Sequence, residues 1–273
     1  MKLDTLLVDV ADGIATITLN RPHKKNAMNP ALHRDMTAAL DALRYDSAAR
    51  VVLITGAGDA FCGGMDLKEF FTDLKDDPAE YDRVFRMATE WRGRTLRYYP
   101  KPTIAVVNGY CFGGAFTPVC ACDFAVAADE AVFGLSEVNW AILPGGIVAW
   151  NVTQLMNYRD ALYYACTGDT FHGQEAAKMG LVNFSVPRAE LKAATVKFAR
   201  KLMKKSPAAL RYTKECVRAV RNMDVVQAAD YLNAKSDALR YRDPEKGRAE
   251  ATKQFLDEKS FKPGLGEYRR KSG

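Results

Sequence analysis

Short apolar runs alternate along this chain with segments of helical periodicity, and this alternation constrains the fold more than any other feature. Three continuous apolar runs have the length of buried strands: residues 51–55, 103–107 and 124–127. Residues 31–43 instead carry leucine and methionine at helical spacing. Strands that alternate with helices predict an α/β fold whose strands pair mostly in parallel.

The N-terminal segment carries two local signals. Residues 6–10 and 14–19 are β-branched runs separated by Ala11-Asp12-Gly13, which predicts a hairpin. Asn29-Pro30 is typical of a helix N-cap followed by proline at the first helical position. The sequence therefore predicts a hairpin followed by a helix.

The pattern changes after Val148, where helical periodicity takes over. Four segments are typical of amphipathic helices: residues 188–204, 207–222, 225–239 and 244–256. Ser206-Pro207 and Asp243-Pro244 interrupt the pattern between them. We therefore predict an α/β core at residues 1–190 and a helical C-terminal region at residues 191–273.

The charge balance is only mildly basic. Thirty-nine lysines and arginines against thirty-three acidic residues give a net charge of +6, and no block of five like charges occurs. Such a charge fits an anionic small molecule at least as well as nucleic acid. We therefore expect a small-molecule substrate and no nucleic-acid partner.

Cysteine usage and the first residues predict the compartment. The six cysteines lie in largely apolar surroundings without a C-x-x-C pair, which predicts reduced, buried thiols. The first residues carry acids where a signal peptide would need an apolar core. Both observations predict a cytoplasmic protein.

Two stretches without charge, residues 102–122 and 138–158, are long enough to span a bilayer. Both contain glycine, proline and asparagine, which are typical of turns and loops. We predict that both are buried strand–loop–helix pieces and that the chain does not enter a membrane.

Three familiar catalytic or binding patterns fail on inspection. The loop after residue 55 begins like a dinucleotide fingerprint, but Phe61 replaces the glycine that permits close helix packing. Residues 134–138 miss the nucleophile-elbow pattern because Val138 replaces its second glycine. The three histidines have no spacing typical of a metal site.

Two glycine loops and one carboxylate remain. The loops at residues 60–69 and 108–115 each follow an apolar strand and precede a helix, so their backbone N–H groups converge outside the sheet. Glu137 is the only charged residue between Glu130 and Arg159, so burial is expected to raise its pKa and suit it to acid–base catalysis. Each loop is also compatible with an ordinary turn, and Glu137 with a surface position.

Together these segments resemble the crotonase (enoyl-CoA hydratase/isomerase) superfamily. The resemblance covers nearly the whole chain and rests on the motifs Asn20-Arg21-Pro22, Asn26-Ala27 and residues 63–69, 108–114 and 133–137. Residues 64–69, 133–140 and 253–257 are most similar to the hydroxycinnamoyl-CoA (feruloyl-CoA) hydratase-lyase branch. The resemblance implies a crotonase-like ββα spiral core with a helical C-terminal trimerisation region.

The resemblance also implies a reaction. An aryl 2-enoyl-CoA is hydrated and then cleaved by a retro-aldol step to an aromatic aldehyde and acetyl-CoA. Glu137 activates the water and later accepts the β-hydroxyl proton, while the N–H groups of Met65 and Gly114 hold the thioester oxygen. One anion site serves both enolates, so no cofactor is expected beyond the coenzyme A of the substrate.

Further roles follow from matching positions. The resemblance places Lys24 at the CoA phosphates, Gly63 and Leu67 along the adenine and pantetheine path, and Ser136 and Trp140 at the acyl end. Plain hydratases of the family carry a second catalytic glutamate where this chain has Thr117, as the hydratase-lyases also carry a hydroxyl residue there. Glu137 is then the sole acid–base group.

The chain departs from the branch at the phenolic end of the substrate. The hydratase-lyases carry tyrosines where this chain has Phe70 and Asn233. Phe71, Tyr81 and Tyr231 are neighbouring aromatic residues that are candidates to compensate. A site that pairs a phenol discriminates strongly, so the preferred ring stays open.

The resemblance implies a homotrimer built by the C-terminal helices. In the family, two such trimers often stack into a hexamer. Two other functions remain open. One is a simple enoyl-CoA hydratase or dehydratase that does not cleave its product. The other is a non-catalytic crotonase-fold protein that touches RNA through residues 204–205 and 269–271, although such basic clusters are more often solvated surface.

Overall fold

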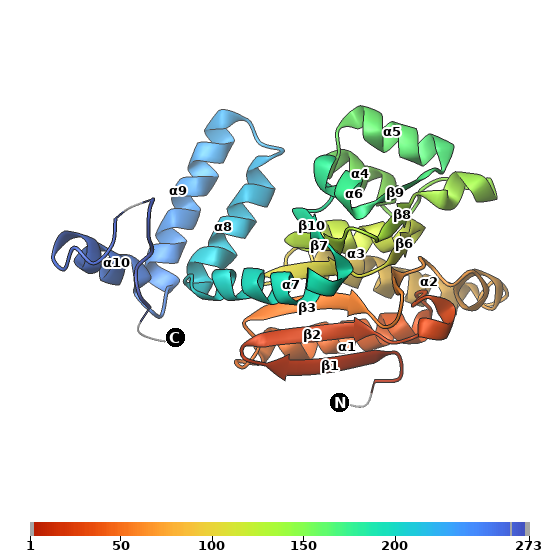
Figure 1. Cartoon of the computed structure of the whole chain (residues 1–273), viewed down its shortest axis with the longest axis horizontal. Helices are drawn as coiled ribbons and strands as arrows, with labels where there is room; N and C mark the ends of the chain where they lie inside the picture. Colours follow the sequence, from red (N-terminus) through yellow and green to blue (C-terminus); the bar gives the residue numbers. More distant parts are fainter. Residues whose placement is uncertain (1–2, 263, 271–273) are drawn as a thin grey trace. The chain divides into compact units, whose positions relative to one another are not determined.

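The computed structural model describes residues 3–262 and 264–270. These divide into two compact units, Met1–Lys197 and Phe198–Gly273. The first unit contains two β-sheets with helices packed on them, and the second is helical (Figure 1). A mixed α/β fold with a helical C-terminal region is therefore confirmed.

The larger sheet has six strands in the order β1-β2-β3-β5-β7-β10. Its strands are β1 (Leu6–Ala11), β2 (Ile14–Leu19), β3 (Val51–Gly56), β5 (Thr103–Val107), β7 (Phe124–Ala128) and β10 (Phe184–Val186). The predicted hairpin is confirmed, since β1 and β2 pair antiparallel through a turn in which Asp12 and Gly13 both have positive φ. All other neighbours in this sheet pair in parallel, as predicted.

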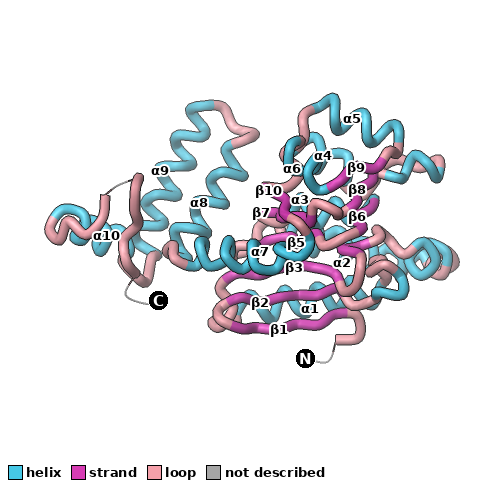
Figure 2. The backbone as a smooth tube through the Cα atoms, viewed as in Figure 1, coloured by secondary structure: helices cyan, strands magenta, loops and turns pink. Residues whose placement is uncertain are grey.

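A second sheet contains four very short strands in the order β4-β6-β8-β9 (Figure 2). They are β4 (Ala60–Cys62), β6 (Tyr110–Phe112), β8 (Val132–Gly134) and β9 (Thr170–His172). The sequence analysis placed loops where β4 and β6 lie. Strands of three residues are too short for a periodic pattern, so pairing between distant segments defines them.

Glycine is required where the chain passes from the first sheet to the second. A Cβ atom on Gly56, the last residue of β3, would lie 2.0 Å from the carbonyl oxygen of Ala60. A Cβ atom on Gly109, between β5 and β6, would lie 1.9 Å from the carbonyl oxygen of Asp59. Only glycine therefore fits at these two positions, where the β3–β4 and β5–β6 connections lie close together. Beyond these connections, β4 and β6 pair in parallel.

The helices of the first unit cover the sheets. They are α1 (Pro30–Tyr45), α2 (Pro78–Thr89), α3 (Phe116–Ala121), α4 (Val148–Leu155), α5 (Tyr158–Thr167) and α6 (Gly173–Lys178). The predicted N-cap of α1 is confirmed, because the Asn29 side chain accepts a hydrogen bond of 2.9 Å from the amide of Leu32. The leucines and methionine at helical spacing on α1 are buried.

The two uncharged stretches differ in how far they are buried. Residues 102–122 are mostly buried, as predicted. The prediction of burial is wrong for most of residues 138–158, where Val148, Val152 and Met156 are buried but eight other large apolar side chains are exposed: Val138, Trp140, Ile142, Leu143, Ile147, Trp150, Leu155 and Tyr158. This stretch forms an irregular loop and the short helix α4, and only part of that helix faces the core. No helix in the described ranges is long and apolar enough to cross a membrane.

Burial of the cysteines is confirmed only in part. All six are free, and Cys62, Cys111, Cys120 and Cys122 are buried. Cys166 is exposed and Cys216 is half-buried, so the prediction is wrong for these two. Both lie on helix surfaces, where the identity of the neighbouring residues does not fix which way a side chain faces.

Helix α7 (Arg188–Met203) precedes three helices of the second unit, α8 (Pro207–Val220), α9 (Val225–Arg242) and α10 (Gly247–Leu256). The predicted start of the last helix at residue 244 is wrong. Asp243 accepts hydrogen bonds from the amides of Glu245 and Gly247, and Lys246 has φ +50°, so the turn delays the helix to Gly247.

The basic clusters of the second unit are partly neutralised. Lys205 pairs with Glu267, and Arg270 pairs with Glu245. Lys271 of the predicted cluster lies outside the described residues. These ion pairs within the unit favour a structural role for both clusters.

Candidate active site

The first glycine loop leaves β4 and presents an amide at Met65. The amide of Met28 donates to the carbonyl of Gly64 (2.8 Å), and the amide of Asp66 donates to the carbonyl of Met28 (2.9 Å). These two bonds flank Met65, and successive N–H groups of an extended segment point to opposite sides. The N–H of Met65 therefore faces away from Met28.

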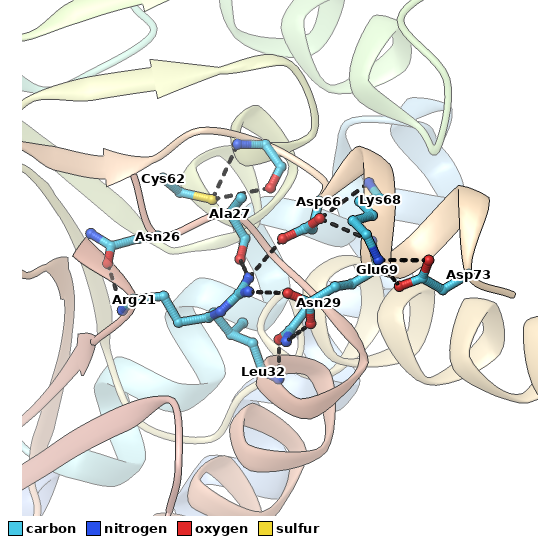
Figure 3. Close-up of polar contacts among 11 residues, drawn as sticks. Arg21, Asn26, Ala27, Asn29, Leu32, Cys62, Asp66, Lys68, Glu69 and Asp73 are labelled. Atoms are coloured by element: carbon cyan, nitrogen blue, oxygen red, sulfur yellow. Dashed lines mark hydrogen bonds and ion pairs between the residues drawn. The ribbon is translucent and has the colours of Figure 1, made fainter. Parts of the chain in front are cut away.

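A buried ion cluster holds the chain just after Met65 (Figure 3). Arg21 donates to Asp66 Oδ2 at 3.1 Å and to Glu69 Oε1 at 2.6 Å. Asn29 donates to the other oxygen of Glu69 at 2.7 Å. Burial raises the pKa of Asp66, but hydrogen bonds from the Glu69 amide and from Arg21 outweigh it and hold the pKa below its ordinary value.

The second glycine loop follows β6 and lies against the first. A Cβ atom on Gly64 would lie 2.9 Å from the carbonyl oxygen of Phe112 and 3.6 Å from the amide nitrogen of Gly114. A Cβ atom on Gly114 would lie 3.2 Å from Cγ of Met65. Gly114 is the second residue of a 3-10 turn, where an N–H group has no acceptor within the turn. The predicted pair, Met65 and Gly114, is thus adjacent in space.

Glu137 lies beside this pair. It is in the 3-10 turn Ser136–Trp140, and a Cβ atom on Gly113 would lie 3.1 Å from its Oε1. Its Oε2 is buried and has no hydrogen-bond partner within the described chain. As predicted, burial raises the pKa of the Glu137 carboxyl, and only a backbone hydrogen bond opposes this shift. The arrangement places a carboxyl group beside the adjacent residues Met65 and Gly114.

One charged residue at this place was missed by the sequence analysis. Arg92 is 4% exposed, and its Nη1 lies 3.3 Å from Sδ of Met65 and 3.5 Å from the carbonyl oxygen of Gly114. Its Nε donates to the carbonyl of Ala88 at 2.8 Å. Nothing in the local sequence marks Arg92, because its neighbourhood comes from segments far apart in the chain.

The residues expected near coenzyme A surround the first loop. Lys24 is exposed in the turn Pro22–Lys24, and the amide of Gly63 donates to the carbonyl of Lys25 at 2.7 Å. Leu67 is exposed at the start of the next helical turn. The turn that carries Lys24 therefore contacts the first loop, to which Gly63 and Leu67 belong.

Ser136 and Trp140 are the residues expected at the acyl end, and Thr117 is the residue expected at the position of the second glutamate of plain hydratases. Ser136 and Trp140 share the turn of Glu137, and Trp140 is 66% exposed. Thr117 is buried on α3, where its hydroxyl donates to the carbonyl of Gly146 at 3.4 Å. Ser136 and Trp140 thus lie on the same turn as Glu137. Thr117 lies on α3, which directly follows the turn that carries Gly114.

Phe70 is part of a buried apolar cluster rather than a polar pocket wall. It packs with Val84 and Ala88, and Met65 packs against the same cluster. Its ring meets the edges of His33 at 5.6 Å and Tyr81 at 5.8 Å between centroids. The position therefore offers an apolar surface next to Met65.

Tyr231 and Asn233 lie on α9 in the second unit. The ammonium of Lys235 lies 5.3 Å from the centre of the Tyr231 ring, and Asn233 is exposed. Their roles toward the substrate stay predictions. Within the described ranges there is no group of three or more metal-ligating side chains that could hold a metal ion.

Known proteins resemble this chain over most of its length. Residues 9–263 match the family model described as enoyl-CoA hydratase/isomerase. A hydroxycinnamoyl-CoA hydratase-lyase from Pseudomonas fluorescens is 50% identical over 267 residues, which are 97% of each chain.

Solved structures of similar fold include two enoyl-CoA hydratases. The protein from Bacillus anthracis is 30% identical with a TM-score of 0.84, over 93% of this chain and 97% of the other. The protein from Mycobacterium smegmatis is 27% identical with a TM-score of 0.85, over 93% of this chain and 96% of the other. The similarity extends over both units of the chain.

Proposed function

The chain belongs to the enoyl-CoA hydratase/isomerase (crotonase) family, and from this premise we propose that it hydrates an aryl 2-enoyl-CoA and cleaves the product to an aromatic aldehyde and acetyl-CoA. The relative from Pseudomonas fluorescens, a hydroxycinnamoyl-CoA hydratase-lyase, supports the substrate class. The observation that carries the mechanism is the Glu137 carboxyl, which lies against Gly113 with one oxygen unpartnered, beside Met65 and Gly114.

The amides of Met65 and Gly114 hold the thioester oxygen. Their segments are in contact, and the orientation of each N–H leaves it available to a ligand. Fixed donors of this kind act most strongly on the form of the substrate that carries negative charge. They therefore favour the enolate over the neutral thioester.

In the hydration half, Glu137 accepts a proton from water. The hydroxide adds to Cβ of the enoyl thioester, and the electron pair of the double bond moves onto the thioester oxygen. The protonated Glu137 then returns a proton to Cα, which completes the β-hydroxyacyl-CoA. The raised pKa of the carboxyl suits both directions of this transfer.

In the cleavage half, the same carboxyl accepts the proton of the β-hydroxyl group. The Cα–Cβ bond breaks, the aldehyde leaves, and the electron pair forms the enolate of acetyl-CoA in the same oxyanion site. The protonated Glu137 returns its proton to the terminal carbon of that enolate, which completes acetyl-CoA and restores the carboxylate. Thr117 stands where plain hydratases carry a second glutamate, so Glu137 performs both halves alone.

The aryl end of the substrate meets a surface with fewer hydroxyl donors than the related branch carries. Phe70 contributes only apolar surface beside Met65, and Asn233 has a shorter polar side chain than tyrosine. A missing partner for a phenol weakens discrimination for that group. We therefore expect this enzyme to accept rings without a 4-hydroxyl group.

The remaining roles complete the proposal. Lys24 meets the CoA phosphates, Gly63 and Leu67 line the path of the adenine and pantetheine, and no cofactor is used besides the substrate's coenzyme A. The protein is a cytoplasmic homotrimer or homohexamer assembled through its C-terminal helices. Light scattering coupled to gel filtration tests the assembly, and a stable monomer would contradict it.

Product analysis tests the reaction. The protein is incubated with feruloyl-CoA, coumaroyl-CoA, cinnamoyl-CoA and crotonyl-CoA, and the acyl-CoA products and aldehydes are separated and quantified. The proposal predicts aldehyde and acetyl-CoA in equal amounts from the aryl substrates. Accumulation of the β-hydroxyacyl-CoA without aldehyde would show a simple hydratase instead.

A further inference from the structure

Arg92 is a buried cation that pairs with no carboxylate of the described residues. It lies in a helical turn, Glu90–Thr95, between α2 and β5. In the described part of the chain, no carboxylate forms an ion pair with it, and its hydrogen-bond partners are neutral: Ala88, Met65 and Gly114. Burial lowers the pKa of Arg92 to about 10, so the guanidinium is charged at neutral pH.

An unbalanced charge in the interior is unfavourable, and a fold rarely retains one without a use. Besides the neutral carbonyl acceptors, the thiol of Cys62 favours the charged form, but burial keeps this thiol protonated by raising its pKa to about 12. The described residues therefore supply no balancing anion. Arg92 differs in this from Arg21, which has two carboxylates within 3.1 Å.

The contacts of Arg92 identify where a balancing anion forms. Its Nη1 reaches the side chain of Met65 and the carbonyl of Gly114, the two residues whose amides hold the thioester oxygen in the proposed reaction. A Cβ atom on Gly114 would lie 3.4 Å from the same Nη1. The neutral thioester places no charge there, whereas both enolates place one.

We propose that Arg92 is a positioning residue of the oxyanion site, which fixes Met65 and Gly114 and supplies the positive charge that stabilises the thioester enolate. The inference rests on the proposed function, because it requires that reaction's enolates. A charge that acts on the enolate and not on the neutral thioester lowers the barrier without tightening substrate binding. The effect therefore falls on kcat and leaves KM nearly unchanged.

Three substitutions separate charge from packing. Arg92→Met keeps the length and apolar stem, Arg92→Gln keeps a hydrogen-bond donor, and Arg92→Lys keeps the charge. We expect kcat to fall roughly 30- to 100-fold in the Met and Gln variants, the size expected for a unit charge near an anion in a partly solvated interior. Arg92→Lys should recover most of the loss.

A second readout isolates the enolate from the aryl chemistry. Acetyl-CoA is incubated with each variant in D₂O, and exchange of its methyl protons is followed by NMR. The exchange rate should fall in the Met and Gln variants by about the same factor as kcat. Melting temperatures and circular dichroism of each variant verify the fold. If Arg92→Met does not fold, Arg92→Gln and Arg92→Lys still compare a neutral with a charged side chain at this position.

The outcomes are distinct. Loss of kcat and exchange in the neutral variants, with KM preserved and recovery by lysine, supports the role of Arg92. Equal kcat and exchange in wild type, Arg92→Gln and Arg92→Met overturns it while the proposed function stands. A wild-type protein with neither turnover of any enoyl-CoA nor exchange overturns the proposed function itself.

Discussion

Two buried arginines show how this fold treats charge in opposite ways. Arg21 is 6% exposed and is closed by Asp66, Glu69 and the carbonyl of Ala27 (Figure 3). Arg92, equally buried, has only neutral partners. The first arginine completes its interactions inside the protein, and the second leaves a charge for a ligand to complete.

The same contrast applies to the carboxylates. Asp66 accepts from Arg21 and from the amides of Lys68 and Glu69, whereas Glu137 keeps a buried oxygen without a partner. A satisfied buried network fixes geometry, while unsatisfied groups lower stability and concentrate at functional sites. The difference indicates that the Arg21 cluster is a scaffold for the loop that holds Met65, and the proposed roles of Glu137 and Arg92 rest on the same difference.

The largest expected effect comes from Glu137→Gln. The amide keeps the shape of the side chain but cannot accept the proton of water or of the β-hydroxyl group. We expect turnover to fall by at least about 10³-fold, within the range for a lost general acid–base, while affinity for a non-reactive acyl-CoA persists. Steady-state kinetics and calorimetric titration measure the two quantities.

The matched control for that variant is Glu190→Gln, at an exposed position in the first turn of α7. It should retain wild-type turnover. Near-normal turnover in Glu137→Gln would contradict the contrast between Glu137, whose buried oxygen has no partner, and Asp66, whose oxygens are hydrogen-bonded.

Arg21→Met should have the largest effect on stability. It strands the buried Asp66 without its cation, and breaking a buried pair from one side typically lowers the free energy of unfolding by about 3–5 kcal/mol. Urea denaturation measures this change. The same substitution at Arg92 strands no charged partner and removes an unpaired buried charge, so we expect a change of less than about 1 kcal/mol there.

Arg83→Met provides the surface control, since Arg83 pairs with Glu80 on an exposed face of α2. Loss of such a pair changes stability by less than about 1 kcal/mol. Equal destabilisation by Arg21→Met and Arg92→Met would contradict the contrast between Arg21, which pairs with carboxylates, and Arg92, which has neutral partners.

The pH dependence of stability sharpens the comparison for Glu137. Its pKa in the folded state is raised above the ordinary value of 4.5, so the folded state binds its proton more tightly than the unfolded state. Below pH 4.5 both states are protonated and the side chain is neutral in each. As pH rises through the raised pKa, the buried carboxylate destabilises the folded state.

Glu137→Gln should therefore match the wild type in stability at low pH and exceed it increasingly above pH 4.5. Thermal denaturation of both proteins across pH 4 to 8, in buffers of constant ionic strength, measures the difference. A difference that is independent of pH would show that the carboxyl is solvated.

The smallest expected effect concerns the ring of the substrate. Phe70→Tyr adds a hydroxyl group beside Met65 and His33. We expect the ratio of kcat/KM for coumaroyl-CoA over cinnamoyl-CoA to rise by about 3- to 10-fold, the size of one modest hydrogen bond. Phe85→Tyr, at an exposed position on α2, should leave the ratio unchanged. An unchanged ratio in Phe70→Tyr would place the ring elsewhere.

Local patterns predicted the elements that local physics determines. The hairpin, the N-cap of α1 and the long buried strands depend on turn residues, capping and apolar runs that neighbours in sequence provide. The strands β4, β6, β8 and β9 could not be predicted, because three residues acquire strand geometry only by pairing with distant partners.

For the site, too, the sequence predicted only the features that neighbouring residues determine. Glycine loops and an isolated Glu137 are visible in the sequence, and the pKa direction followed from its apolar neighbours. Arg92 was not, because the absence of a counter-ion is a property of the folded interior. The exposure of Trp140 and its apolar neighbours was mispredicted because lack of charge does not determine which residues face inward.

The most direct measurement supplies the β-hydroxyacyl-CoA intermediate itself to Glu137→Gln in a single-turnover experiment, alongside the enoyl-CoA. If one carboxyl serves both halves of the reaction, the variant forms no adduct from the enoyl-CoA and no aldehyde from the intermediate, whereas the wild type forms both. Release of aldehyde from the supplied intermediate at the wild-type rate would contradict the account, because a second group would then have to accept the hydroxyl proton.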